Sequence, residues 1–549
     1  MKINNSFLIS LLILLILLFG FSLFKNISYP LLWNDESITV MLGKRVLNYG
    51  YPKVHDEKNI IYHFFPDPNL GVWRKIDANI DGGWTQYYFS TIGIKLSEFT
   101  DDIYLKTALL RIPFAVIGLA GLIIFAIAIS QIFSNKKERI TFFILFSIFE
   151  LFSISLILHL REVRYYSIVI FLYSLLIYLF IKFNYLKNIK RKTYNVILIL
   201  LLLLLLNTFY TSFIIFILIL LIYEGIKFIR NILQNKNYYT ESKKLLQATL
   251  PIFISILIAT PFTIFYKIIP ILKALSELKH FNLSTYFSHI NTIVTFFYQY
   301  EFLYLALIIK LVLTYLLFFK KKKILINFHK IKLSNFFLLL FIIYILLIAK
   351  MPYLYERYFI YIQPILIGMI IIDIFILYEL LLDNIKKTKK YFYQFLFILI
   401  VFGLIFKINI ISEHLYELNQ PYYGPVDYVI NYLKEKFVKP ENLIIATNYE
   451  ETSYMYYLGS KVIIGYARAN LKEDLKKQPD IIIYRKYNPG DPGIFNYFLQ
   501  NNKYNKIIFP VSDYFVNNMP DTCCHLFRTK MPENRNQNLI IFVKQKESD

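Results

Sequence analysis

Long, nearly uninterrupted apolar runs are the feature that most constrains how this chain folds. The run Val196–Leu206 contains only Val, Ile and Leu. A helix needs about 20 such residues to cross the hydrocarbon core of a bilayer, whereas soluble domains alternate short apolar and polar stretches. The sequence therefore predicts a polytopic α-helical membrane protein with about eleven spans, near 7–24, 111–131, 140–158, 165–183, 193–210, 212–229, 247–269, 301–319, 333–349, 358–380 and 391–409.

Clusters of Lys and Arg separate many of these runs, around Lys136, Lys190, Lys243, Lys320 and Lys386. All five clusters fall on one side if the N-terminus lies inside, and basic loops stay in the cytoplasm. Topology thus explains the formal charge of +23, and we expect no nucleic-acid partner. We expect an integral protein of a bacterial or archaeal plasma (inner) membrane, with a cytoplasmic N-terminus. The first run lacks a small-x-small cleavage site and is expected to remain as an anchor.

Five segments are then expected on the outer face: 25–110, 159–164, 270–300, 350–357 and the tail from about residue 410. The tail is more polar and alternates helix-like runs with strand-like ones at 443–447, 462–466, 480–484, 506–510 and 539–543. We therefore divide the chain into a transmembrane domain, 1–409, and an extracytoplasmic α/β domain, 410–549.

The only two cysteines, Cys523 and Cys524, are adjacent in this tail. Adjacent cysteines rarely bond each other because the disulfide geometry strains the peptide between them. No metal-ligand spacing surrounds them. Ordinary thiols are the favoured interpretation, and the sequence calls for no metal and no cofactor.

Asp35 and Glu36 open the first outward segment, ahead of an apolar pattern with helical spacing. Carboxylates at a helix N-terminus satisfy unpaired N–H groups and interact well with the helix dipole, which explains the pair taken alone. Two observations favour a functional role. The pair lies beside an apolar span, where uncompensated charge is costly, and other outward segments carry matching charges.

The second outward segment carries His159, Arg161, Glu162 and Arg164 between two spans. Snorkelling, or a Glu–Arg pair that holds two helices together, would explain these residues. The functional alternative is a second carboxylate that faces Asp35, with arginine to hold an anion.

Lys350 and Arg357 lie in the third segment, on the face where positive charge near span ends is otherwise sparse. Phosphate binding is a ready explanation for both residues. Snorkelling remains the competing explanation for either one singly.

Together these segments resemble the GT-C membrane glycosyltransferases, which include protein O-mannosyltransferases and the aminoarabinose transferases that modify lipid A. The resemblance covers about residues 1–410 and rests on the order and sidedness of several short motifs. They are Trp33-Asn34-Asp35-Glu36, Gly82-Gly83-Trp84-Thr85-Gln86-Tyr87-Tyr88-Phe89, Arg111-Ile112-Pro113, Glu162-x-Arg164-x-Tyr166, Lys350-Met351-Pro352 and Glu356-Arg357-Tyr358. One departure is clear: the aminoarabinose branch has a lysine where this chain reads Asn79-Ile80-Asp81-Gly82-Gly83. That removes one expected phosphate contact, for which Lys75 is a candidate replacement.

The resemblance implies an inverting transfer of a sugar from a polyprenyl-phosphate donor to an acceptor hydroxyl. The acceptor is a protein, a lipid or a glycan. Asp35 is the expected base, Glu36 orients the acceptor or caps the helix, and Glu162 is the second carboxylate. Arg164, Lys350 and Arg357 are the first candidates to bind the leaving phosphate, followed by His159 and Arg161. The segment 270–300 either covers the site or forms an aromatic belt at the interface.

Two other classes of protein remain possible. A lipid-linked-glycan polymerase or ligase would also use outward cationic loops. A transporter or flippase would place its polar residues at midplane inside the spans, whereas the clusters noted above lie at the outer ends.

Overall fold

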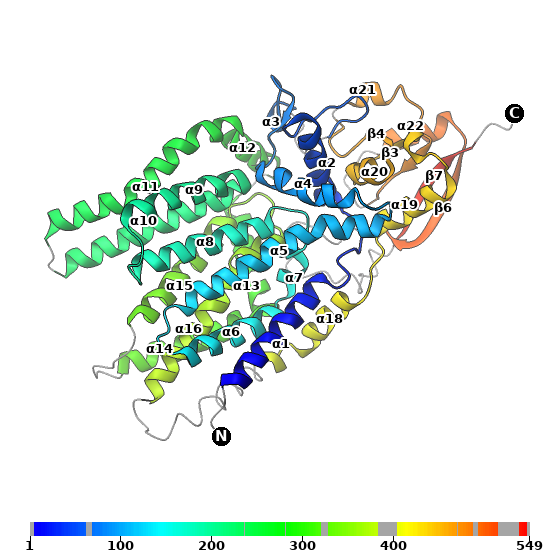
Figure 1. Ribbon diagram of the computed structural model, residues 1–549. Coiled ribbons are helices and arrows are strands. Elements are labelled where there is room, and N and C mark those ends of the chain that lie inside the picture. Colours follow the sequence, from blue (N-terminus) through cyan, green and yellow to red (C-terminus); the bar gives the residue numbers. More distant parts are fainter. Residues whose placement is uncertain are drawn as a thin grey trace.

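The computed structural model describes most of the chain, from helix α1 to strand β7 (Figure 1). The described residues are 5–61, 68–234, 237–279, 282–319, 328–382, 403–468, 470–486, 492–513 and 537–545. Cys523 and Cys524 lie outside these ranges.

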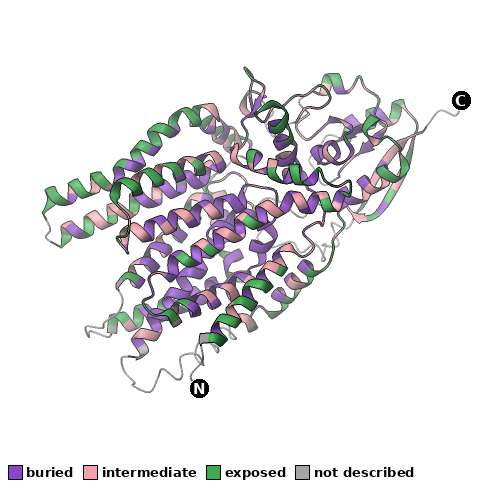
Figure 2. Cartoon of the chain, in the orientation of Figure 1, coloured by how far each residue is buried: buried purple, intermediate pink, exposed green. Residues whose placement is uncertain are grey.

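In these ranges, eight single helices are long and apolar enough to cross a membrane, and they match eight of the predicted spans. They are α1 (Asn5–Phe24), α5 (Ile103–Ser130), α8 (Tyr166–Asn184), α9 (Arg191–Thr208), α10 (Tyr210–Leu233), α11 (Tyr238–Phe265), α15 (Phe328–Ile348) and α16 (Gln363–Leu382). The apolar stretch of α16 is 89% buried inside the protein, whereas that of α1 is 22% buried. The outer helices thus present apolar surface, much of it green in Figure 2. Contact with lipid accounts for an exposed apolar surface of this extent.

Two further pairs of helices meet at sharp bends: one bend breaks the predicted span 140–158, and the other joins the predicted span 301–319 to a helix in the segment 270–300. Helices α6 (Lys136–Leu151) and α7 (Ile154–Leu160) meet at 84°, and α13 (Leu283–Gln299) and α14 (Leu303–Phe319) meet at 87°. Ser153, between α6 and α7, donates a 2.9 Å hydrogen bond to Oε1 of Glu301, between α13 and α14. This hydrogen bond connects the two bends. Counting each bent pair as one span gives up to ten in the part of the chain that is described. The predicted span 391–409 lies mostly outside it.

Some charged side chains lie within the spans, which corrects the expectation that they gather at the outer ends. Lys310 of α14 lies 3.0 Å from the carboxylate of Asp373 in α16, and Ser334 of α15 donates to the same carboxylate. Pairing offsets the cost of placing charge in hydrocarbon, so this contact joins three helices.

The first outward segment folds into short elements that pack on one another. It contains α2 (Asn34–Tyr49), α3 (Pro68–Gly71), β1 (Val72–Trp73), β2 (Ala78–Asn79) and α4 (Thr85–Ser97). A Cβ atom on Gly43 would lie 2.0 Å from Ser90 Oγ. Helix α2 therefore approaches α4 to a distance that only glycine permits.

The segment 270–300, expected as a loop, is helical where it is described. It contains most of α12 (Ile268–Lys279) and all of α13. Ile293 and Phe297, one helical turn apart, are both buried. Their spacing gives α13 an apolar face that packs on the spans.

The C-terminal region is α/β, as predicted. Its five-stranded sheet has the order β4-β3-β5-β7-β6, in which β3 is parallel to β4 and β5 while β7 is antiparallel to β5 and β6. Each strand overlaps one of the predicted strand-like runs. The elements are α18 (Ile408–Asn419), α19 (Pro425–Lys436), the 3₁₀ turn Pro440–Asn442, β3 (Ile444–Thr447), α20 (Glu451–Leu458), β4 (Lys461–Ile464), α21 (Leu471–Asp474), β5 (Ile481–Ile483), α22 (Pro492–Asn501), β6 (Tyr504–Ser512) and β7 (Asn538–Lys544).

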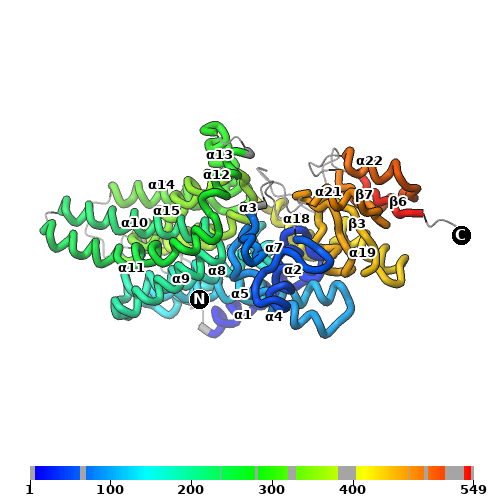
Figure 3. Tube along the Cα trace, turned by 90° about the horizontal axis from the view of Figure 1, so that it is seen from above, coloured from blue at the N-terminus to red at the C-terminus, as the bar shows by residue number. Residues whose placement is uncertain are grey.

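Helices α2 and α4 lie between the spans and this sheet (Figures 1 and 3). Hydrogen bonds fix the chain just ahead of α2. Leu31 N donates to Asp427 Oδ1 at 3.2 Å, Leu32 N donates to Tyr457 Oη at 3.2 Å, and Ser453 Oγ donates to Leu32 O at 2.9 Å. The C-terminal region thereby sets where α2 begins.

Candidate active site

A polar cavity of about 290 Å³ opens where the first outward segment, the ends of several spans and the C-terminal region meet. Three of its walls come from junctions between helices: α7 to α8, α9 to α10, and α15 to α16. Helix α12 contributes Leu275. The cavity therefore collects residues from the segments 25–110, 159–164, 270–300 and 350–357, which the sequence places on one face.

Asp35 lies in this cavity, in the first turn of α2. Its Oδ2 atom is 3.3 Å from Nη2 of Arg357 and 3.5 Å from Nη2 of Arg164. Only 16% of the Asp35 side chain is exposed. One carboxylate is thus shared by two guanidinium groups, which come from segments far apart in the sequence.

Both arginines are held in place by further contacts. Arg164 Nη1 donates to Asp35 O at 3.3 Å and to Thr39 Oγ1 at 3.1 Å. Arg357, in the 3₁₀ turn Glu356–Tyr361, lies 3.8 Å from the ring centroid of Tyr355 and 5.4 Å from that of Trp33. Cation–π contacts of this kind orient a guanidinium group without neutralising it.

Both arginines also remain positively charged. Burial lowers the pKa of each guanidinium, but Asp35 and the neighbouring tyrosines outweigh burial, and the pKa of Arg164 and of Arg357 is raised overall. The cavity therefore holds two permanent cations, the arrangement that suits an oxyanion such as phosphate.

Asp81 is a cavity residue that the sequence analysis noted only as a departure from the family pattern. Its side chain is exposed to the cavity. Removal from bulk water raises the pKa of Asp81 to about 6; the charge of Arg164 opposes this shift and that of Asp35 adds to it. Composition and spacing carry no signal for such a shift, because it arises from the packing around the loop.

The C-terminal region also lines the cavity, through Tyr449, Glu451 and Tyr466. Tyr466 N donates to Glu451 Oε1 at 3.2 Å, and burial raises the pKa of Glu451 above its ordinary range. Sequence reasoning missed all three residues. They meet Asp35 only through contacts that span some 400 residues of chain, and no local motif marks them.

Glu36 points away from the cavity and is completely buried. Arg111 of α5 holds it with two hydrogen bonds, Nε to Oε1 at 2.9 Å and Nη2 to Oε2 at 2.5 Å. The backbone N–H of Val163 donates to Oε1 at 2.9 Å. Glu36 thereby ties the start of α2 to α5 and to the α7–α8 junction, and its geometry is that of a positioning residue.

Glu36→Gln is expected to destabilise the protein, because it leaves the buried Arg111 cation without its carboxylate. Removing one partner of a buried ion pair costs about 3–5 kcal/mol. A lower midpoint of thermal unfolding in detergent would show this. An unchanged midpoint with lost activity would instead support a direct catalytic role for Glu36.

The other predicted residues do not line the cavity. His159 Nδ1 lies 3.1 Å from Glu162 Oε1, and both side chains are buried. Arg161 Nη1 donates to Lys25 O at 3.0 Å, and Lys350 is exposed. Glu162 therefore contacts His159, whereas the contacts of Asp35 are with arginines. A catalytic role for Glu162 and substrate binding by His159, Arg161 and Lys350 remain predictions.

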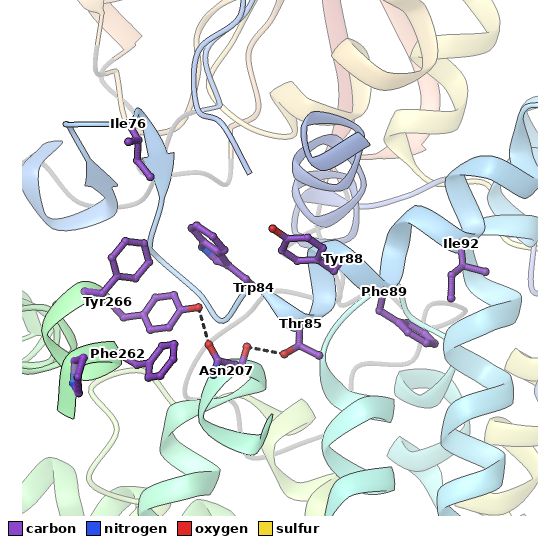
Figure 4. A pocket seen from close by; sticks show the side chains of 11 residues that line it. Ile76, Trp84, Thr85, Tyr88, Phe89, Ile92, Asn207, Phe262 and Tyr266 are labelled. Carbon is purple, nitrogen blue, oxygen red and sulfur yellow. Dashed lines mark hydrogen bonds between the residues drawn. The ribbon is translucent and has the colours of Figure 1, made fainter. Parts of the chain in front are cut away.

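An apolar groove of about 900 Å³ lies next to the polar cavity. Figure 4 shows the aromatic side chains of α4 and α11 that line it, among them Trp84, Tyr88, Phe262 and Tyr266. Consecutive residues divide the two spaces: Gly83 and Thr208 line the cavity, while Trp84 and Asn207 line the groove. A polar space and an apolar one are therefore direct neighbours.

The boundary is tightly built. A Cβ atom on Gly83 would lie 2.1 Å from Asn207 O. Thr85 Oγ1 donates to the same carbonyl at 3.0 Å, and Tyr266 Oη donates to Asn207 Oδ1 at 3.0 Å.

Within the described ranges, no group of three or more His, Cys, Asp or Glu side chains is placed to hold a metal ion.

The sequence matches no protein-family model and no curated protein. The fold, however, is similar to that of ArnT from Cupriavidus metallidurans, solved with undecaprenyl phosphate. The TM-score is 0.53 at 9% identity, over 98% of this chain and 98% of that one. The archaeal oligosaccharyltransferase AglB from Archaeoglobus fulgidus, solved with an inhibitory peptide and a dolichol-phosphate, has a TM-score of 0.47 at 10% identity, over 88% of this chain and 70% of that one.

The similarity to ArnT extends over the full length of both chains and includes the spans and the C-terminal region. The chain therefore has the same fold as ArnT, in agreement with the GT-C fold predicted from the sequence.

Proposed function

We propose that this protein is an inverting glycosyltransferase that moves a sugar from a polyprenyl-phosphate donor to an acceptor hydroxyl on the outer face of the membrane. The observation that carries the proposal is the junction of a two-arginine cavity with an apolar groove. A fold alone does not define a reaction, but this pair of spaces matches a lipid with a charged head. The positive-inside pattern supports the orientation.

Arg164 and Arg357 would bind the donor phosphate. A sugar phosphodiester carries one negative charge, and a second charge develops on the phosphate as the sugar leaves. Cations fixed beside that oxygen stabilise the transition state more than the ground state, which is what accelerates a reaction. Asp35 keeps the two guanidinium groups together before the donor arrives.

The groove would hold the polyprenyl chain. Its lining is almost entirely apolar and aromatic, so burial of isoprene units there is favourable by about 25 cal/mol per Å². The chain would leave the cavity beside Trp84 and run along α4 and α11 (Figure 4).

Phe262→Ala should weaken the binding of long donors selectively, because it removes part of the groove wall. We expect the KM of an undecaprenyl-phosphate sugar to rise about tenfold, or about 1.4 kcal/mol, and the KM of a geranyl-phosphate sugar to change little. Phe253→Ala is the matched control. Phe253 lies on the same helix, is 54% exposed and does not line the groove. Equal effects on both donors would place the chain elsewhere.

The C-terminal region would contact the acceptor. Tyr449, Glu451 and Tyr466 of this region line the cavity. They are polar groups suited to a hydroxylated acceptor. A protein, a lipid or a glycan acceptor would each fit this chemistry.

A lipid-linked-glycan polymerase or ligase is the second candidate, because the same two guanidinium groups would bind a diphosphate. Offering monophosphate and diphosphate donors of the same sugar to the purified protein tests the choice. Transfer from the monophosphate donor alone supports the proposal, and transfer from the diphosphate donor alone overturns it.

A further inference from the structure

Two carboxylates of the first outward segment, Asp35 and Asp81, line the cavity, and their surroundings differ. The Oδ2 atom of Asp35 lies within 3.5 Å of both Arg164 and Arg357. By contrast, no hydrogen bond or ion pair from the described residues reaches the carboxylate of Asp81.

The loop that carries Asp81 places it close to the boundary between cavity and groove. Asp81 N donates to Asn79 Oδ1 at 3.2 Å, and Gly82 and Gly83 follow, with Gly83 against Asn207. The next residue, Trp84, lies in the groove (Figure 4). A lipid that crosses this boundary would bring its phosphate and its sugar past Asp81.

Two charged groups from other elements act on Asp81. Arg164 at the α7–α8 junction favours the ionised carboxylate, and Asp35 in α2 disfavours it. Tyr87 of α4 and Tyr210 at the start of α10 are the neighbouring titratable groups, and burial raises the pKa of Tyr87. Tyrosine side chains are neutral near pH 7, so only Arg164 and Asp35 change the charge balance of Asp81.

We propose that Asp81 is the catalytic group that accepts the proton of the acceptor hydroxyl, while Asp35 aligns the two arginines. The proposal rests on the glycosyltransferase function proposed above. As the acceptor oxygen bonds to the anomeric carbon, its proton moves to a carboxylate oxygen of Asp81. The bond from the anomeric carbon to the phosphate oxygen breaks, and its electron pair leaves with polyprenyl phosphate beside Arg164 and Arg357.

This assignment follows a general rule for paired carboxylates. In active sites that contain two carboxylates, a carboxyl group whose surroundings raise its pKa is suited to exchange protons with the substrate. Efficient general bases titrate near the working pH. The cavity position of Asp81, its lack of a cation partner and its raised pKa all meet these requirements.

The test is a pH profile of the full-length protein in lipid, with an undecaprenyl-phosphate sugar and its acceptor. For the wild type, we expect kcat to fall as pH drops through about 6, because the base becomes protonated. Asp81→Asn should lower kcat about 10²–10⁴-fold and remove this acid limb. Asp81→Glu should recover part of the rate. Binding of undecaprenyl phosphate to Asp81→Asn should stay within about threefold of wild type, since its phosphate is bound by the arginines.

Different results would overturn different claims. A full rate and an intact acid limb in Asp81→Asn would remove Asp81 from the mechanism. Loss of the acid limb in Asp35→Asn but not in Asp81→Asn would return the base to Asp35. Absence of transfer by the wild type from every polyprenyl-phosphate donor, despite undecaprenyl-phosphate binding, would overturn the proposed function and this inference with it.

Discussion

Asp35→Asn is expected to lower kcat/KM about 10³-fold, the size of effect seen when a preorganised charged group of an active site is lost. The substitution removes the negative charge that draws Arg164 and Arg357 together. The two cations would then repel each other, and the leaving phosphate would lose its aligned partners. Initial rates of sugar transfer at saturating and limiting donor concentrations would measure the change.

Asp101→Asn is the matched control. Asp101 belongs to the same outward segment, is fully exposed and lies 3.5 Å from Lys106. This variant should keep the wild-type rate, and both variants should unfold at the same temperature within a few degrees. A normal rate in Asp35→Asn would show that the pair of arginines needs no carboxylate between them.

Arg357→Gln is expected to lower kcat about 10²–10³-fold, because it removes one of the two cations that face the leaving phosphate. Binding of undecaprenyl phosphate should weaken as well, since the product carries two negative charges. Calorimetric binding of undecaprenyl phosphate, together with transfer rates, would separate the two effects.

Lys350→Gln gives the informative comparison. The sequence predicts phosphate binding for both residues, whereas only Arg357 lines the cavity and Lys350 is exposed. We expect a loss below about tenfold for Lys350→Gln, in line with the small energies of exposed charges. A larger loss there than in Arg357→Gln would mean that the phosphate binds outside this cavity.

Much of the membrane architecture can be predicted from the sequence, because lipid requires long apolar helices and leaves few alternatives. The two sharp bends, between α6 and α7 and between α13 and α14, could not be predicted. Neither break contains Pro or Gly between its helices: one has Phe152 and Ser153, the other Tyr300, Glu301 and Phe302. The hydrogen bond from Ser153 to Glu301 connects residues 148 positions apart, and no local pattern reports such a contact.

The candidate site, too, can be predicted only in part from the sequence. Asp35, Arg164 and Arg357 could be selected in advance, because charges at the ends of spans are few and costly. Glu36 shares the motif with Asp35 but faces the opposite way, and its partner Arg111 is 75 residues distant. One helical position thus separates a cavity carboxylate from a buried ion pair, and only the packing of α2 against α5 distinguishes them.

Asp81 and Glu451 are cavity residues that the sequence alone does not mark as functional. Each is an ordinary acidic residue in a loop or a short helix, and its importance depends on what surrounds it. The tyrosines of the C-terminal region likewise reach the cavity only because Leu31 and Leu32 are bound to α19 and α20. The assignment of residues 410–549 as a separate domain remains a prediction, since this region also forms part of the cavity wall.

The most direct test of the central claim is a transfer assay with purified wild-type protein in lipid, in which radiolabelled undecaprenyl-phosphate sugars are offered with a membrane glycoconjugate extract. We expect label to appear in a product with inverted anomeric configuration, and undecaprenyl phosphate to be released in equal amount. No transfer from any monophosphate donor, combined with transfer from a diphosphate donor or with movement of the lipid across the bilayer, would contradict the account and favour a ligase or a flippase.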